Sequence, residues 1–226
     1  MTTPALQLTD VRKTYTVGGE EIVALSHATL TVDVDEMVSL VGPSGSGKTT
    51  LCSIAGGLLR ATEGSVCVAG RDISGLRPKE LAAFRLESVG FVFQSVNLVP
   101  FLTARENLMV VDELGGRRNR RETRRRADQL LDELGLADRA DNLAGQLSGG
   151  QRQRVAVGRA LMNEPELVLF DEPTSALDTS LGEQVMELIR GEVKSRGTAA
   201  IVVTHDDRIT RFTDRTVHIR DGALDA

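Results

Sequence analysis

The chain has 226 residues, of which 41% are hydrophobic and 26% are charged, and its formal net charge is −5. This composition is typical of a soluble globular protein, and the negative balance gives no general attraction to nucleic acid or anionic membranes. No apolar stretch approaches the ~18 residues of a membrane helix, and no signal-peptide pattern opens the chain, so we expect a cytoplasmic protein. Cys52 and Cys67 show neither metal nor disulfide spacing, and we expect both to be small buried side chains.

The N-terminal part of the chain predicts strands interrupted by two helices. Residues 6–15 and 23–34 alternate apolar and polar side chains, as half-solvated antiparallel strands do, with Gly18-Gly19 in the turn. Further strands are predicted at 37–41, 65–68 and 89–93, and helices at 49–57 and 78–87.

Residues 95–163 change to helical periodicity. A capping box of Thr103 and Glu106 begins one helix, and Gly115-Gly116 ends it. Further helices are predicted at 119–134 and from Leu147–Gln151 to Asn163. After Pro165, strands return at 167–170, 199–204 and 216–219, with a helix at 179–195 between the first two. Alternating strands and helices build parallel βαβ units, so we predict an α/β fold into which the helical block is inserted.

A glycine-rich loop lies between the strand at 37–41 and the helix at 49–57. Its sequence matches the phosphate-binding loop, in which backbone N–H groups and a helix N-terminus converge on one anion. Lys48 is expected to reach the β- and γ-phosphates, and the Thr49 hydroxyl to bind Mg²⁺. The alternative is a plain Gly/Ser turn, but both flanks favour nucleoside triphosphate binding. The predicted binding residues are Gly42, Pro43, Ser44, Gly45, Ser46, Gly47, Lys48, Thr49 and Thr50.

Two acidic residues follow the buried strand at 167–170. Asp171 at the carboxyl end of a parallel strand is placed beside the phosphates of the loop strand, where it can hold Mg²⁺. Glu172, one residue further, could accept a proton from an attacking water or orient it. The alternative, two acids that merely end a strand, loses weight because a phosphate loop lies upstream.

Ser148-Gly149-Gly150-Gln151 provides a second helix start suited to anions. Ser148 can cap the helix, the glycines expose N–H groups, and the helix dipole points outward. Taken alone, this sequence is an ordinary helix start. It indicates a function only in combination with the glycine loop and Asp171-Glu172.

Together, the glycine loop, residues 147–151 and Asp171-Glu172 resemble the nucleotide-binding domain of ABC-type ATPases in order and spacing. The resemblance implies one domain over 1–226. In it, 1–94 and 164–226 form a RecA-like P-loop NTPase core with a mostly parallel sheet and an N-terminal antiparallel β subdomain. Residues 95–163 form the inserted α-helical subdomain.

The resemblance implies roles for further residues. Tyr15 is expected to stack on adenine, and His205 to contact the γ-phosphate. Gln94 is expected to be the Q-loop glutamine, which binds Mg²⁺ and takes part in catalysis. Ser175–Asp178 matches the D-loop, which places Asp178 at the nucleotide site. Tyr15, Gln94 and His205 could each instead be structural, and His27 and His218 match no motif.

The family mechanism needs two copies of the chain and the cofactors ATP and Mg²⁺. ATP held on one glycine loop is closed over by the Ser148–Gln151 helix of the other copy, because two helix N-termini neutralise a trianionic group better than one. A two-fold head-to-tail homodimer then buries two ATP molecules, and hydrolysis lets it open.

Residues 90–100 and 102–107, with Gly56-Gly57-Leu58, resemble more closely the MacB/LolD group. That resemblance implies a peripheral protein on the cytoplasmic face of the membrane, bound to two copies of a separate permease near Gln94–Phe101. Its expected output is export of a hydrophobic or amphiphilic substrate such as haem, a drug, a peptide or a lipoprotein. Alternatives are an ATPase that regulates a cell-division type of membrane partner, and a nucleotide kinase, since guanylate kinases carry a similar loop.

Seven arginines occur between Arg117 and Arg126. They could steer the protein toward acidic lipids or an acidic loop of a partner. We expect the plainer alternative, a solvated helix face whose charge is offset by Glu113, Glu122 and Asp128.

Overall fold

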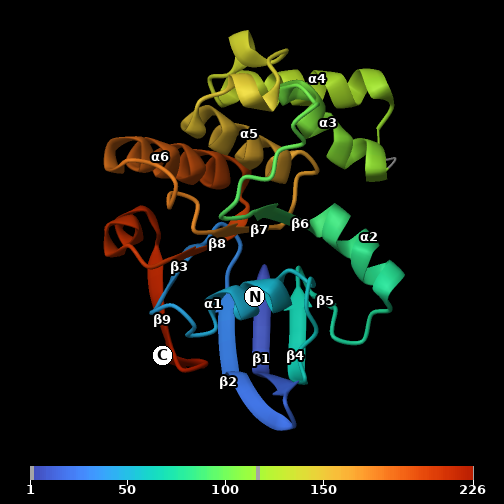
Figure 1. Cartoon of the computed structure of the whole chain (residues 1–226). Coiled ribbons are helices and arrows are strands. Elements are labelled where there is room, and N and C mark those ends of the chain that lie inside the picture. Colours follow the sequence, from blue (N-terminus) through green and yellow to red (C-terminus); the bar gives the residue numbers. More distant parts are fainter. Residues whose placement is uncertain (1–2, 116–117, 226) are drawn as a thin grey trace.

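The computed structural model describes residues 3–115 and 118–225, and it contains two sheets with helices packed around them (Figure 1). The first sheet is antiparallel and has the order β2-β1-β4-β5. Its strands are β1 (Leu6–Val17), β2 (Glu20–Val32), β4 (Glu63–Val68) and β5 (Arg71–Asp72). The first two strands run closer to the glycine turn than predicted, and β5 was not predicted because two residues carry no periodicity.

The second sheet has the order β10-β9-β3-β8-β7-β6 and is parallel except where β10 pairs with β9. Its strands are β3 (Met37–Val41), β6 (Val89–Val92), β7 (Leu167–Asp171), β8 (Ala199–Thr204), β9 (Arg215–Arg220) and β10 (Ala223–Asp225). All residues of β3 and β8 are buried, as expected for parallel strands covered on both faces. The fold is therefore α/β with one mostly parallel and one antiparallel sheet.

Within the described residues, six α-helices and three short 3₁₀ segments cover the sheets. The α-helices are α1 (Lys48–Ala55), α2 (Pro78–Ser88), α3 (Ala104–Gly115), α4 (Arg120–Glu133), α5 (Gly149–Leu161) and α6 (Thr179–Arg196). The 3₁₀ segments are η1 (Ala137–Arg139), η2 (Ala144–Gln146) and η3 (Asp207–Phe212). Helices α3, α4 and α5 form a layer on the far side of α6 and β7 from the antiparallel sheet (Figure 1). None of the helices in the described ranges is long and apolar enough to cross a membrane.

Two clusters of buried side chains lie on opposite faces of the parallel sheet. Val168 and Phe170 of β7 pack with α3, α4, α5 and α6, whereas Leu167 and Leu169 pack with α1 and the antiparallel sheet. The parallel sheet thereby holds α1 on one face and α5 on the other. The edge at which its parallel strands end lies between these two helices.

Two sequence expectations about single side chains need correction. Cys52 is buried, but Cys67 is only half-buried, because its neighbours on β4 take the inward positions. Phe93 was expected inside a covered strand, yet β6 ends at Val92 and Phe93 is 38% exposed.

The arginine run divides into two groups, so it is not simply a solvated face. Arg118 donates from Nη1 to Oδ1 of the fully buried Asp112 over 2.9 Å. Arg126 is also mostly buried, and burial lowers its pKa. The expected solvated face comprises Arg120, Arg121, Arg124 and Arg125. Gly116 and Arg117, which include part of the predicted break and the start of the run, lie outside the described residues.

Candidate functional site

The glycine loop joins β3 to α1, and its backbone has the form that a bound anion requires. Gly45 and Gly47 have φ of +79° and +104°, which side-chain-bearing residues rarely adopt. A Cβ atom on Gly47 would lie 2.6 Å from the carbonyl oxygen of Ala24. Gly47 also caps α1 without a side-chain hydrogen bond, and the first turn contains no acidic residue. The N-terminal N–H groups of α1 are thus left for an external acceptor.

Lys48 folds back over this loop. It is 8% exposed, and its Nζ donates to the carbonyl oxygens of Gly42 and Pro43 over 2.7 and 2.8 Å. The buried Ser46 Oγ has no hydrogen-bond partner among the described residues. A cation and an unpaired hydroxyl beside free N–H groups fit a polyphosphate.

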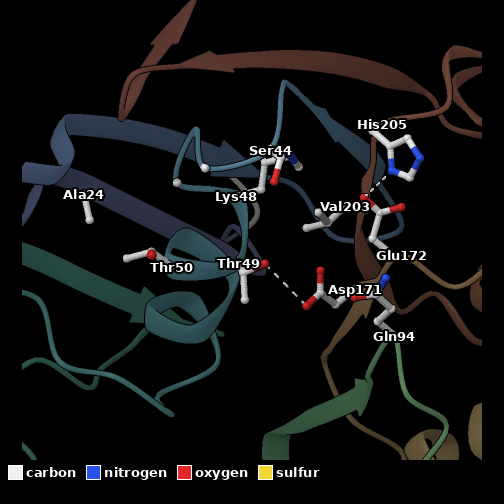
Figure 2. A pocket seen from close by; sticks show the side chains of 12 residues that line it. Ala24, Ser44, Lys48, Thr49, Thr50, Gln94, Asp171, Glu172, Val203 and His205 are labelled. Carbon is white, nitrogen blue, oxygen red and sulfur yellow. Dashed lines mark hydrogen bonds and ion pairs between the residues drawn. The ribbon is translucent and has the colours of Figure 1, made fainter. Parts of the chain in front are cut away.

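Asp171 faces the loop because β7 lies in the parallel sheet close to β3, and both strands end at the same edge. Its Oδ2 lies 3.5 Å from Thr49 Oγ1 (Figure 2). Burial raises the pKa of Asp171, the charge of Glu172 raises it further, and Thr49 and Lys48 oppose both effects. A cation nearby would stabilise the ionised carboxylate of Asp171 and so offset the free-energy cost of burying its charge.

The oxygen donors of Thr49 and Asp171 suit Mg²⁺, which prefers one or two carboxylates together with substrate phosphates. Across the described chain, no three His, Cys, Asp or Glu side chains are grouped so that they could hold a metal by themselves. The donor set therefore fits a magnesium ion that arrives with a phosphorylated substrate.

Glu172 and His205 meet at the rim of the same edge. His205 Nδ1 lies 2.8 Å from Glu172 Oε1 (Figure 2). Glu172 has φ of +52°, and its N–H donates to the carbonyl oxygen of Val203 over 3.0 Å. A non-glycine residue held in this region is strained, and such strain is concentrated at functional sites.

These groups line one cavity of about 550 Å³ (Figure 2). Ala24 and Val203 line it as well, although no sequence motif predicts either residue at the site. Tyr15 is not among the lining residues; it lies 40% exposed on β1, with Lys13 Nζ 5.0 Å from its ring centre. The predicted site residues that line the cavity are Ser44, Gly45, Gly47, Lys48, Thr49, Thr50, Gln94, Asp171, Glu172 and His205.

The Ser148–Gln151 helix start lies outside this cavity. Ser148 Oγ accepts from the N–H of Gln151 over 3.3 Å, and Gln151 Oε1 accepts from the N–H of Ser148 over 2.8 Å. Asp178 likewise caps α6, through a 3.0 Å hydrogen bond from the N–H of Leu181. Among the described residues, the α1 N-terminus has no side-chain cap and borders the cavity, whereas the α5 N-terminus is capped by Ser148 and lies away from it.

Comparison with known proteins identifies this arrangement. A family model described as "ABC transporter" matches residues 25–175. The chain belongs to the ABC transporter family. It is an ATP-binding cassette, the ATPase component of that family.

Relatives and solved structures agree with this assignment. The cassette is 45% identical over 220 residues to the macrolide export ATP-binding/permease protein MacB of Rhodopirellula baltica, covering 97% of this chain and 32% of that protein. It spans about a third of the length of such MacB proteins. It is 44% identical to the uncharacterized ABC transporter ATP-binding protein YknY of Bacillus subtilis, covering 97% and 94% of the two chains. The dimeric post-hydrolysis cassette MJ0796 bound to ADP and Pi superposes with a TM-score of 0.89 at 41% identity, covering 98% and 97%.

Arg159, on α5 of the cassette, is a residue near the site that no sequence motif predicted. Its Nη1 and Nη2 donate to the carbonyl oxygens of Asn97 and Val96 over 2.8 and 3.0 Å. Burial lowers its pKa, and Asn97 is held at φ of +46°. Arg159 thus ties α5 to the segment that follows Gln94. An arginine within the apolar stretch 155–161 was the available signal.

The same segment borders a groove of about 470 Å³ between α2, β6, α3 and α5. The rings of Phe91 and Phe93 stack there, with centroids 5.5 Å apart. Leu58 and Phe93 contribute exposed apolar surface to the groove.

Proposed function

We propose that the cassette works as a homodimer on the cytoplasmic face of a membrane, where ATP closes it and hydrolysis opens it. This cycle drives a MacB-type permease, present in two copies, that exports a hydrophobic or amphiphilic substrate. The observation that carries the proposal is the separation of the two helix N-termini, because the α5 terminus lies away from the cavity of its own chain. In a two-fold dimer, each cavity gains the α5 terminus of the other copy.

The residues predicted for the site each have a role in this proposal. The glycine loop, Lys48 and Thr50 bind the phosphates, and Tyr15 stacks on adenine. Thr49, Asp171 and Gln94 hold Mg²⁺, which would neutralise charge on the β- and γ-phosphates. From the opposing copy, Ser148, Gly149, Gly150 and Gln151 donate to the γ-phosphate, and Asp178 lies at the interface.

Glu172 accepts a proton from the attacking water, or orients it, in line with the phosphorus. His205 holds the Glu172 carboxylate through the 2.8 Å contact and presents its other ring nitrogen to the γ-phosphate. Two fixed polar groups at a developing charge lower the barrier more than mobile water does.

The permease docks in the groove beside residues 94–101. Exposed apolar side chains next to partly polar walls suit an amphipathic helix. Closing of the dimer moves α5, and Arg159 carries that movement to the groove through the carbonyl oxygens of Val96 and Asn97. Export is supported by the similarity to MacB proteins, which are named for macrolide export.

The purified cassette tests the dimer directly. Its rate of ATP hydrolysis per chain should rise with protein concentration and then level off, because two copies complete each site. A rate per chain that stays constant on dilution to nanomolar protein would overturn the proposal.

A further inference from the structure

Four arginines form an exposed basic face at the start of α4. Arg120, Arg121, Arg124 and Arg125 are all exposed, and their spacing of one, four and five residues places them on one side of the helix. They stand out in a chain whose net charge is −5.

Little within the described chain neutralises this face. Arg124 Nε lies 3.9 Å from Asp128 Oδ2, but the other Asp128 oxygen already accepts from Arg105 over 2.5 Å. Glu122 lies between these arginines in the sequence, but its carboxylate accepts from the N–H of Asn119 as part of the helix cap. No ion pair joins Arg120, Arg121 or Arg125 to another described residue.

The placement of these arginines disfavours the helix by itself. Cations at a helix N-terminus oppose the macrodipole, and the pairs Arg120–Arg124 and Arg121–Arg125 place like charges four residues apart. Both effects are unfavourable for the helix, and the ion pairs within the described chain do not offset them in full. The four arginines therefore do not serve to stabilise the fold of the cassette.

The basic face begins close to the proposed permease groove. Val111 of α3 lines the groove, α3 ends at Gly115, and α4 begins at Arg120. In Figure 1 the end of α3, the start of α4 and helix α2 lie on the same side of the molecule. The placement of the basic face near a membrane rests on the proposed function, in which a permease docked in the groove would bring its bilayer to the side of the molecule where α4 begins.

We propose that the basic face of α4 binds the phosphate groups of anionic lipids. The charges are spread over an exposed helix face, and none of the four arginines lines the nucleotide cavity or the groove. A diffuse layer of headgroups matches this arrangement, since arginines near an anionic surface are attracted to it without a fitted pocket. Docking of an acidic protein segment is the outcome that the test below separates from lipid binding.

Flotation of the isolated cassette with lipid vesicles tests the proposal without a permease. Binding to vesicles of phosphatidylcholine with phosphatidylglycerol is expected at about 50 mM salt, and it should weaken as salt shortens the screening length. Pure phosphatidylcholine vesicles should bind far less. The variant Arg121→Glu/Arg125→Glu should lose at least about tenfold in partition coefficient, because two attractive charges become repulsive.

A charge-matched variant on other faces, Arg139→Glu/Arg211→Glu, controls for net charge and should keep its binding. Unfolding temperature and ATP hydrolysis in both variants check that the fold is intact. Equal loss in both variants, or no binding of the unaltered cassette to anionic vesicles, would overturn the proposal. Loss of binding to a permease in the α4 variant without any vesicle binding would assign the face to a protein partner instead. Because vesicle binding needs neither dimerisation nor a permease, this test can fail while the proposed transport function stands.

Discussion

Glu172 and His205 are held together across two neighbouring strands, with Nδ1 of the histidine 2.8 Å from Oε1 of the glutamate. Glu172 follows β7 and His205 follows β8, so the parallel pairing of these strands sets the contact. The Glu172 side chain is 13% exposed, whereas that of His205 is 67% exposed. The histidine thus shields the carboxylate and leaves its own outer edge free for a ligand.

Replacing Glu172 by Gln should lower the rate of ATP hydrolysis at least about a hundredfold, because an amide cannot accept the proton of the attacking water. ATP affinity, measured by titration with a fluorescent analogue, should change little, because the loop and Lys48 supply the phosphate contacts. Glu166→Gln makes the same change beside the start of β7 and should leave hydrolysis intact. Unchanged turnover in the Glu172 variant would remove this residue from its role.

Asp171→Asn should stabilise the nucleotide-free cassette while weakening its response to Mg²⁺. Burial and Glu172 raise the pKa of Asp171 in the fold, so the folded state binds more protons than the unfolded state as pH passes between the two pKa values. The wild type therefore loses stability as pH rises from about 4, the ordinary value for Asp, through the folded pKa. Above that pKa, the cost of the charged form is fully present.

Urea unfolding at a series of pH values measures this difference. The stability advantage of the Asn variant should grow with pH and then level off. A variant that is less stable than the wild type at neutral pH would contradict the assignment of the charge cost to Asp171.

Arg159→Ala should lower kcat for ATP hydrolysis more than it lowers ATP affinity. Removing the guanidinium leaves the carbonyl oxygens of Val96 and Asn97 without their donor, at a cost of about 2 kcal/mol in the free energy of unfolding. The released segment no longer fixes Gln94 at the cavity. Hydrogen exchange at residues 95–99 should become faster.

Arg154→Ala provides the matched control, since Arg154 also lies on α5 and donates to a carbonyl oxygen, that of Leu134. A purely structural role would make both variants lose stability and keep kcat. Equal kcat in the two variants would show that Arg159 does not position the Gln94 segment.

Local sequence patterns predicted those parts of the molecule that depend on neighbours along the chain. Apolar runs located β3, β7 and β8, and the Thr103–Glu106 capping box forms as predicted, with a 2.9 Å hydrogen bond from Thr103 N–H to Glu106. The glycine loop could be recognised because its backbone conformation requires glycine at fixed positions, and this requirement is visible in the sequence. The short strands β5 and β10 were not predicted, since two or three residues are too few to show an alternation of apolar and polar side chains.

Features that depend on distant contacts could not be predicted in this way. Arg118 and Arg126 looked like their solvated neighbours, and only packing of α4 against α3 and the Glu164 region buries them. Arg159 meets the Val96–Asn97 segment across more than sixty residues of chain. The three-dimensional structure is thus needed to separate the arginines of the 117–126 run into ion-paired and surface groups, and to show that Arg159 contacts the Val96–Asn97 segment.

The composite ATP site is tested most directly by the mass of the Glu172→Gln cassette in solution, measured by light scattering with and without ATP. The account predicts a monomer without ATP, a dimer with ATP, and a monomer again when Ser148→Arg is added, because a bulky cation at the α5 cap obstructs closure. ATP binding to the monomer should survive in that double variant, since Ser148 lies outside the cavity of its own chain. A Ser148→Arg variant that still dimerises on ATP and, with Glu172 restored, hydrolyses it at the normal rate would contradict the account.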